Sequence, residues 1–284
     1  MKGIFIMDIK NTNFDLKQTA DSGQCFRMNQ TGDNQYGLIA YGKYLNLIRM
    51  DEDTVRLGCG EEEYHQIWEG YFDLVYDYGS IIQSLLSGED RFLSQAAAYG
   101  QGIRILRQEP FETMISFIIS QNKNIPSIKN CIERLCERFG DYIDCKERPG
   151  GGYYTFPKAE ILAGAEAGEL RKLKLGYRDE YIIKASQAVA DGSIDLDELS
   201  RCSYEKAFMK LKGIRGIGDK VANCIALYGL HHIEAFPVDV WINKAIKEFY
   251  NGSFDSGKYQ GYAGIVQQYM FYYIRHLYAK GKGD

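Results

Sequence analysis

The chain has 284 residues, 45% of them hydrophobic and 25% charged, which allows two or three sub-domains around substantial cores. No apolar run reaches membrane-spanning length and the N-terminus lacks a signal-peptide pattern, so we expect a soluble, intracellular protein that contacts no membrane. The formal net charge of -4 argues against nucleic-acid binding only if charge is read over the whole chain. Seven cysteines without CxxC spacing favour reduced thiols.

The first sixty residues have the pattern of β-structure. Two short strands are predicted over 37–41 and 44–49, joined at Gly42-Lys43, and a further turn is predicted at Thr31–Asn34. Acidic residues crowd positions 51–63, where Arg56 is the one basic residue. The sequence therefore predicts a small antiparallel sheet whose last connection is acidic.

From about Glu61 onward, helical patterns dominate. Apolar residues recur at helical spacing from Ile125 to Phe139, and Gly140 is expected to end that helix. The segment Arg148–Gly152 is predicted to be a loop, and the pattern over Tyr262–Ala279 predicts one long amphipathic helix. The expected fold class is α+β, with an N-terminal antiparallel β-sheet sub-domain followed by a two-part α-helical body. We expect sub-domains over 1–75, 76–112, 113–230 and 231–284.

The most informative segment runs from Leu211 to Val240. A helix is predicted to end at Gly213, a glycine-rich connection follows, and Asp219 is suited to start the next helix. Such a hairpin exposes backbone N–H groups beside a helix N-terminus, which is a geometry that holds a phosphate without reading its base. The candidate phosphate-binding residues are Gly213, Arg215, Gly216 and Gly218.

Three side chains after the hairpin are candidates for chemistry. Lys220 lies in the first predicted turn of the second helix, and Cys224 follows one turn later on the same face. Asp239 stands nineteen residues after the lysine and is well placed to cap the helix that runs through Ile242 and Phe249. Between 203 and 224, five basic residues face two acidic ones, so this segment is locally positive.

These residues carry a resemblance to a known family. The hairpin Leu-x-Gly-x-x-Gly-Ile-Gly at 211–218, followed by Lys220 and by Pro-Val-Asp at 237–239, resembles the helix-hairpin-helix motif of base-excision DNA glycosylases. The order of a small sheet and then helices is similar to the 8-oxoguanine DNA glycosylase branch. The resemblance implies that the helical body contains this motif and that the enzyme is bifunctional, cutting the glycosidic bond and then nicking the strand.

The resemblance assigns the chemistry to two residues. A neutral amine on Lys220 would attack the sugar C1′ and form a Schiff base, which permits β-elimination of the 3′ phosphate. Asp239 would be the essential acid that stabilises oxocarbenium character. Without this context, Lys220 would be read as a surface lysine early in a helix.

The resemblance also implies a base pocket. Gly23 would accept a hydrogen bond from N7–H of the oxidised base through its carbonyl, whereas by itself it would be read as a strand or bulge glycine. Gln267 and Phe271, spaced i and i+4, would contact the Watson–Crick edge and stack on the purine; the alternative is that Gln267 is a surface residue and Phe271 a core residue. Cys224 would form the opposite wall, or else be a buried core cysteine.

The same family pattern implies contacts to the strand opposite the lesion. Asn122 and Arg178 would contact the orphaned cytosine, and Tyr177 would act as the intercalating wedge. Alone, Tyr177 and Arg178 would be read as an ordinary helix start. The chain departs from eukaryotic relatives at Ser127, where they have a second cytosine-contacting arginine, and at Trp241, where they have a histidine.

The expected partner is double-stranded DNA that contains oxidised guanine, bound by a monomer at an intracellular, DNA-associated location, the cytoplasm or nucleoid in a prokaryote. No iron-sulfur cluster, metal or other cofactor is expected, since no cysteine follows Cys224, although a cation held by the hairpin carbonyls is left open. Two alternatives are an alkylated-base glycosylase of the same superfamily, against which Lys220 argues, and a non-catalytic helix-hairpin-helix DNA-binding module.

Overall fold

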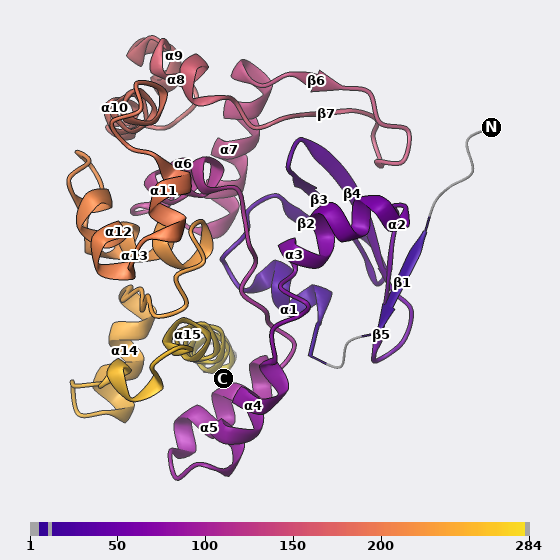
Figure 1. The fold of residues 1–284 in the computed structure, drawn as a ribbon, viewed down its shortest axis with the longest axis vertical. Helices are drawn as coiled ribbons and strands as arrows, with labels where there is room; N and C mark the ends of the chain where they lie inside the picture. The colour runs from indigo at the N-terminus through magenta and orange to yellow at the C-terminus, as the bar shows by residue number, and fades with distance from the viewer. Residues whose placement is uncertain (1–5, 11–12, 282–284) are drawn as a thin grey trace.

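The computed structural model describes residues 6–10 and 13–281, and its N-terminal part is built on one antiparallel sheet (Figure 1). The sheet has the order β1-β5-β4-β3-β2, and neighbouring strands are antiparallel. Its strands are β1 (Met7–Lys10), β2 (Met28–Gly32), β3 (Gln35–Ala40), β4 (Lys43–Arg49) and β5 (Thr54–Leu57). The two strands predicted from sequence are thus β3 and β4, each beginning one or two residues earlier than expected.

One face of this sheet is covered by short helices. These are α1 (Leu16–Asp21), α2 (Glu61–Glu63), the π-helical turn η1 (Tyr64–Trp68) and α3 (Glu69–Tyr71). Trp68 and Phe72 are fully buried against Leu38, Leu45 and Leu47 of the sheet, in a hydrophobic cluster separate from that of the helical body. The segment between α1 and β2, which contains Gly23, leaves this sub-domain on the side that faces the helices.

The remainder of the chain is helical, apart from a small two-stranded hairpin. Its elements are α4 (Tyr78–Ser87), α5 (Arg91–Gly100), α6 (Pro110–Ser120), α7 (Ile125–Phe139), β6 (Tyr142–Ile143), β7 (Tyr153–Tyr154), α8 (Ala159–Ala163), α9 (Ala167–Lys172), α10 (Arg178–Ala190), α11 (Leu196–Arg201), α12 (Tyr204–Lys212), α13 (Asp219–Tyr228), α14 (Val240–Phe249), η2 (Ser256–Tyr259) and α15 (Ala263–Lys280). The α+β fold class is therefore confirmed. One continuous hydrophobic cluster joins the helices from α4 to α15.

Helix α7 shows how local sequence sets its ends. Asn124 caps its N-terminus by accepting a hydrogen bond from the Ser127 N–H at 2.9 Å. At the other end, a Cβ on Gly140 would lie 2.0 Å from the Thr155 carbonyl oxygen, so that position must be glycine. The predicted loop at 148–152 joins β6 to β7, and the predicted helix end at Gly140 is confirmed.

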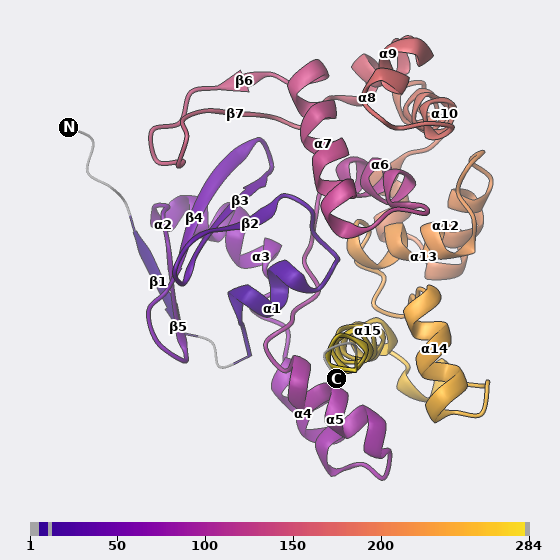
Figure 2. The same ribbon diagram turned by 180° about the vertical axis from the view of Figure 1, so that it is seen from behind.

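The C-terminal helix α15 lies in the middle of the molecule. In both ribbon views it is beside α14, and it also packs on α5 (Figures 1 and 2). Its first half, from Ala263 to Met270, is buried, so it brings side chains from the end of the chain next to the segment around Gly23. Among the described residues, no helix is long and apolar enough to cross a membrane.

Candidate active site

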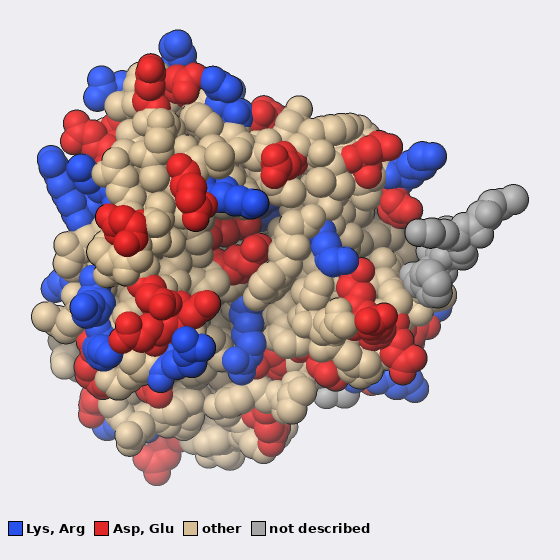
Figure 3. Space-filling model, turned by 45° about the horizontal axis from the view of Figure 1, so that its top comes forward, with Lys and Arg blue, Asp and Glu red and all other residues tan. Residues whose placement is uncertain are grey.

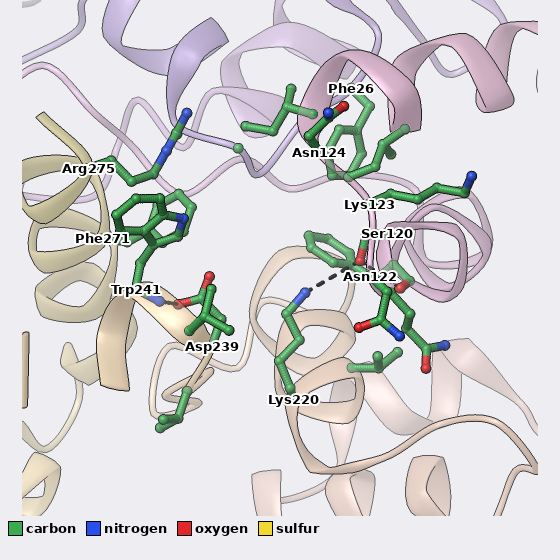
Figure 4. Close-up of a pocket in the computed structure, with 18 of the residues that line it drawn as sticks. Phe26, Ser120, Asn122, Lys123, Asn124, Lys220, Asp239, Trp241, Phe271 and Arg275 are labelled. Carbon is green, nitrogen blue, oxygen red and sulfur yellow. Dashed lines mark hydrogen bonds between the residues drawn. The ribbon is translucent and has the colours of Figure 1, made fainter. Parts of the chain in front are cut away.

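A cavity of about 900 Å³ opens where the sheet sub-domain meets the helical body. Its walls come from the α1–β2 segment, the α6–α7 connection, the N-terminus of α13, the start of α14 and one face of α15. Figure 4 shows Lys220 and Asp239 on facing sides of the open space, with Phe271 and Arg275 on the Asp239 side. Residues almost 250 positions apart therefore share one site.

The α12–α13 connection forms a tight hairpin beside this cavity. Gly216 has φ +94°, and a Cβ there would lie 2.2 Å from the Tyr181 ring, so the hairpin requires glycine at this position. Gln121 donates to the Gly216 carbonyl at 3.1 Å and ties the hairpin to the end of α6. Gly218, rather than Asp219, is the N-cap residue of α13, while the Asp219 carboxylate pairs with Lys212 at 2.5 Å.

The hairpin leaves part of its backbone available to a ligand. The N–H of Gly213 is used within the hairpin, because it donates to the Met209 and Lys210 carbonyls. The N–H groups of Gly216 and Gly218 have no acceptor within the described part of the chain, and Gly218 precedes the positive end of the α13 dipole. Arg215 is 70% exposed and lies 3.6 Å from Glu180. An anion can thus be held at 216–218, but Gly213 serves the fold.

Lys220 extends from the first turn of α13 into the cavity. Its Nζ donates to the Ser120 hydroxyl at 3.4 Å and lies 5.0 Å from the centroid of the Phe117 ring. No carboxylate pairs with it in the residues that the structure describes. The amine is held by one long hydrogen bond and a ring face and interacts with the buried Cys224 thiol, so it can move toward a ligand without breaking an ion pair.

Asp239 is the N-cap residue of α14. Its Oδ1 accepts hydrogen bonds from the N–H groups of Trp241 and Ile242, each at 2.9 Å. Its Oδ2 accepts no hydrogen bond from any described residue, and the side chain is half-buried at the cavity wall. One oxygen therefore fixes the carboxylate by capping, as expected, while the other faces the cavity and can interact with a developing positive charge.

The α15 wall brings Gly23 and Phe271 together. Gly23 has φ +78°, and a Cβ there would lie 3.2 Å from Cε1 of Phe271 and 3.6 Å from Ile125. The guanidinium carbon of Arg275 lies 5.1 Å from the centroid of the Phe271 ring, and its Nη1 donates to the Asp21 carbonyl. Burial lowers the pKa of Arg275 from its usual value. The Gly23 segment is in contact with the Phe271 ring in this conformation, so a flat base can stack on the ring here only after the two separate.

Two of the residues expected in the base pocket do not line the cavity. Gln267 is 3% exposed, donating to the Pro237 carbonyl at 3.0 Å and accepting from the Tyr228 hydroxyl at 3.2 Å. Cys224 is also buried, and burial raises the pKa of its thiol to about 11, so it is a neutral thiol at pH 7. Both lie behind the cavity surface, which means that contact with a base requires the wall to open.

The residues expected at the opposite strand form their own cluster. Asn122, with φ +52°, donates to the Tyr177 hydroxyl at 3.1 Å, and Tyr177 is 51% exposed. Arg178 is 6% exposed, donates to the carbonyls of Leu175 and Gln121, and lies against the Tyr177 ring. Asn122 and Tyr177 are free to meet a ligand, whereas Arg178 is committed to the backbone in this conformation.

The two positions that depart from the eukaryotic pattern lie in different surroundings. Trp241 lines the cavity beside Asp239, and Lys244 Nζ lies 4.5 Å from the centroid of its ring. Ser127 does not line the cavity; its N–H is used by the cap of α7. Trp241 is therefore part of the site, and Ser127 lies on the neighbouring helix start.

Three residues of the site were not singled out from the sequence. Ser120 and Phe117, on the last turns of α6, hold the amine of Lys220, and Arg275 stands one helical turn after Phe271 on the cavity wall. The i+4 spacing from Phe271 to Arg275 could have indicated the third residue. Nothing in the spacing connects α6 with Lys220, because that contact spans 100 positions.

The face in Figure 3 has acidic and basic side chains interspersed, rather than one basic field. The excess of cations predicted near the hairpin is partly neutralised locally, since Lys212 pairs with Asp219 and Lys206 pairs with Glu198. Lys210 and Lys220 form no ion pair with a carboxylate among the described residues. Attraction of an anionic ligand therefore depends on a few cations around the cavity and not on the net charge.

Comparison with known proteins covers both parts of the chain. The family profile for the N-terminal domain of 8-oxoguanine DNA glycosylase matches residues 6–114, and that of the HhH-GPD superfamily of base excision DNA repair proteins matches residues 115–259. The N-glycosylase/DNA lyase of Saccharomyces cerevisiae is 38% identical over 222 residues, which cover 72% of this chain and 58% of the yeast protein. This chain thus spans less than two thirds of that relative.

Solved structures resemble the whole fold. MBOgg1 in complex with a low-affinity DNA ligand has a TM-score of 0.90 and 38% identity, covering 98% of this chain and 97% of that one. The 8-oxoguanine glycosylase/lyase of Clostridium acetobutylicum, solved with double-stranded DNA containing cytosine opposite 8-oxoguanine, has a TM-score of 0.87 and 34% identity, with 97% and 99% covered. The similarity therefore includes both the sheet and the helical body.

Proposed function

The chain belongs to the HhH-GPD superfamily of base excision DNA repair proteins, and from that premise we propose that it removes 8-oxoguanine from double-stranded DNA and then cleaves the strand. The observation that carries the proposal is the pairing of Lys220 and Asp239 across one cavity whose far wall holds Gly23 and Phe271. An amine nucleophile, a carboxylate and a base-sized aromatic wall are the groups that this reaction needs.

The proposed reaction begins with the amine of Lys220 in its neutral form. It attacks the sugar C1′, the bond from C1′ to N9 breaks, and the base leaves with the electron pair and is protonated. The amine gives up two protons, one to the departing base and one to the ring oxygen O4′, as the C1′–O4′ bond breaks and the sugar opens to an imine. Removal of a C2′ proton then expels the 3′ phosphate by breaking its bond to C3′. The free oxygen of Asp239 stabilises positive charge at C1′ and assists the proton transfers.

Recognition of the lesion is assigned to the α15 side of the cavity. The Gly23 carbonyl accepts a hydrogen bond from N7–H of the flipped base, Phe271 stacks on the purine, and Gln267 and Cys224 reach the base after the wall opens. The positive φ of Gly23 and its contact with Phe271 support this assignment, because both demand a residue without a side chain. Selectivity then depends on one backbone oxygen, one ring and the two side chains behind the wall.

The DNA around the lesion is assigned to the hairpin and the α6–α7 connection. The N–H groups of Gly216 and Gly218 bind a phosphate together with Arg215, while Tyr177 fills the space left by the base. Asn122 contacts the orphaned base. Arg178 donates to two backbone carbonyls in the free protein. It contacts the orphaned base only if it gives up these hydrogen bonds.

The proposed enzyme acts on DNA as a monomer and draws every reacting group from its own chain. A nucleophilic amine and a carboxylate supply the chemistry, so the reaction needs no iron-sulfur cluster or other cofactor, and a cation at the hairpin would assist phosphate binding only. The proposed location is with the DNA inside the cell. A sub-domain division at about residues 75, 112 and 230 is proposed with it.

The test of this function is a comparison of lesions. The protein is incubated with duplexes that carry 8-oxoguanine, uracil, 3-methyladenine or thymine glycol, and the released base and cut strand are measured. Release of 8-oxoguanine together with strand cleavage is expected. Release of 3-methyladenine without cleavage would instead favour the alkylated-base glycosylase, and DNA binding with no release of any base would favour a binding module.

A further inference from the structure

A buried chain of hydrogen bonds connects the Gly23 segment with the loop before Asp239. Gln268 Nε2 donates to the Ser22 carbonyl at 2.7 Å, and the Tyr228 hydroxyl lies 2.5 Å from Gln268 Oε1 and 3.2 Å from Gln267 Oε1. Gln267 Nε2 in turn donates to the Pro237 carbonyl at 3.0 Å. Tyr228 is therefore the centre of a path that runs from the start of the chain to its catalytic loop.

Every side chain in this path is buried. Tyr228 is 5% exposed, Gln267 3% and Gln268 1%, so water cannot replace a lost bond at low cost. Burial raises the pKa of Tyr228 well above its usual value, so its hydroxyl carries a proton and is a donor. One hydroxyl proton faces two glutamine oxygens, and the shorter distance shows that Gln268 takes most of it.

This sharing leaves the carbonyl of Gln267 only weakly engaged. Its amide nitrogen donates to the Pro237 carbonyl. Its oxygen makes the longer of the two contacts with the Tyr228 hydroxyl. A donor on a bound base could therefore take over that oxygen without breaking the stronger bond from Tyr228 to Gln268. The Ser22–Gly23 segment would stay in place at the same time.

Tyr228 also touches the wall that holds the nucleophile. It lies two helical turns after Lys220 on α13, and its ring stacks on Phe117 with centroids 5.4 Å apart and planes 18° apart. The Nζ of Lys220 lies over the same Phe117 ring. Tyr228 thus packs against Phe117, which contacts Lys220, and hydrogen-bonds to Gln267 and Gln268 on α15.

We propose that Tyr228 is a positioning residue for base recognition, which through Gln268 holds the carbonyl of Gly23 and through Gln267 presents an amide oxygen to the flipped purine. This role rests on the proposed function, because it assumes that the base is read by Gly23 and Gln267. Asp239 is fixed separately by its helix cap, so the role concerns reading of the base and not opening of the sugar.

The test uses Tyr228→Phe, which keeps the ring stacked on Phe117 and removes the hydroxyl. Single-turnover excision of 8-oxoguanine should fall about tenfold, because a buried hydrogen bond to two glutamine oxygens is lost. Strand cleavage at a preformed abasic site should stay within about twofold of wild type, since no base is read there. The ratio of the two rates is the measured quantity.

Tyr269→Phe is the matched control. Tyr269 is 1% exposed on α15, and its hydroxyl has no hydrogen-bond partner among the described residues, so its removal should change neither rate. If Tyr228→Phe does not fold, Gln268→Met is measured in the same way, because it breaks the path at Ser22 and at the hydroxyl. A selective loss of excision is expected from this variant too.

Each result has one meaning for the proposal. An unchanged ratio in the folded variant, whether both rates stay or both fall together, would overturn a role for Tyr228 in base recognition. Failure of wild-type protein to cleave the abasic site or to release 8-oxoguanine would instead count against the proposed function, because Tyr228 is intact in that sample.

Discussion

On the α13 side of the cavity, Lys220 is held by one hydrogen bond of 3.4 Å and a ring face, whereas on the α15 side Gln267 and Gln268 are buried in a bonded path. The reacting amine can therefore move by breaking one long hydrogen bond, whereas the recognition groups are held by buried hydrogen bonds and reach a base only after the wall opens. Fixed polar groups lose little conformational entropy on binding and discriminate by position. The site therefore combines a mobile nucleophile with recognition groups that buried hydrogen bonds hold behind the cavity surface.

The largest effect is expected from replacing the mobile nucleophile, Lys220. Lys220→Gln should abolish the borohydride-trapped adduct, because an amide cannot form an imine, while binding of 8-oxoguanine DNA persists. Gel separation of the trapped complex and a separate binding titration measure the two properties. Lys210→Gln removes an exposed cation from the preceding helix and should leave the adduct intact. An undiminished adduct in Lys220→Gln would remove this lysine from the nucleophile role.

A smaller loss of activity is expected from a change at Asp239, across the cavity from Lys220. Asp239→Asn keeps an oxygen for the α14 cap and loses the charge, so base release at saturating enzyme should slow by about 100-fold while DNA affinity is largely kept. Asp195→Asn is the control, since Asp195 caps α11 in the same way outside the cavity. Wild-type release by Asp239→Asn would defeat the assignment.

The recognition side is tested next by adding one methyl group at Gly23. A Cβ at Gly23 would lie 3.2 Å from Phe271, and its φ of +78° is unfavourable for alanine, so Gly23→Ala should displace the carbonyl that reads N7–H. Excision of 8-oxoguanine should lose about 1 to 3 kcal/mol of transition-state stabilisation.

Gly252→Ala separates that effect from backbone strain. Gly252 has φ +86° with open space around its added Cβ, so it carries a similar conformational cost outside the cavity. Thermal unfolding should shift comparably in the two variants, and excision should fall only in Gly23→Ala. Normal excision by a folded Gly23→Ala protein would show that Gly23 serves the fold alone.

The smallest expected effect concerns the strand opposite the lesion. Ser127 cannot supply the two hydrogen bonds of an arginine, and Arg178 donates to backbone carbonyls, so removal of 8-oxoguanine opposite cytosine should have only a modest advantage over the other three bases. Each missing contact is worth about 1 to 3 kcal/mol of preference. Ser127→Arg should restore part of it. Single-turnover rates opposite all four bases decide, and strict cytosine dependence in wild type would refute this interpretation.

Patterns local in sequence were predicted well. The helix at 125–139 has its cap, its periodicity and its glycine end between Asn124 and Gly140, and the Asp239 cap depends on a few neighbouring N–H groups. The strand starts were placed one or two residues late because pairing across the sheet, and not local pattern, sets them. Helix α13 begins at Asp219, as predicted, with Gly218 as its N-cap residue and the Asp219 carboxylate paired with Lys212.

Contacts between distant segments could not be predicted. Examples are the hydrogen bond from Arg178 to the Gln121 carbonyl, the contact of Lys220 with Ser120 and the path through Tyr228. These contacts join residues 39 to 246 positions apart, and apolar periodicity does not determine how the helices that carry them pack. The burial of Cys224 and Gln267 behind the cavity surface has the same origin. Sequence indicates which residues carry the chemistry, and packing decides which of them are accessible.

The role of Lys220 as the nucleophile is tested by locating the covalent bond between the protein and DNA. Wild-type protein is trapped with borohydride on a duplex that contains 8-oxoguanine, digested with trypsin and nuclease, and analysed by mass spectrometry. Because modification blocks cleavage at the lysine, we expect the nucleotide remnant on the peptide 216–244, between the cuts after Arg215 and Lys244, with the added mass at Lys220. A remnant on any other lysine, or at the N-terminal amine, would contradict it.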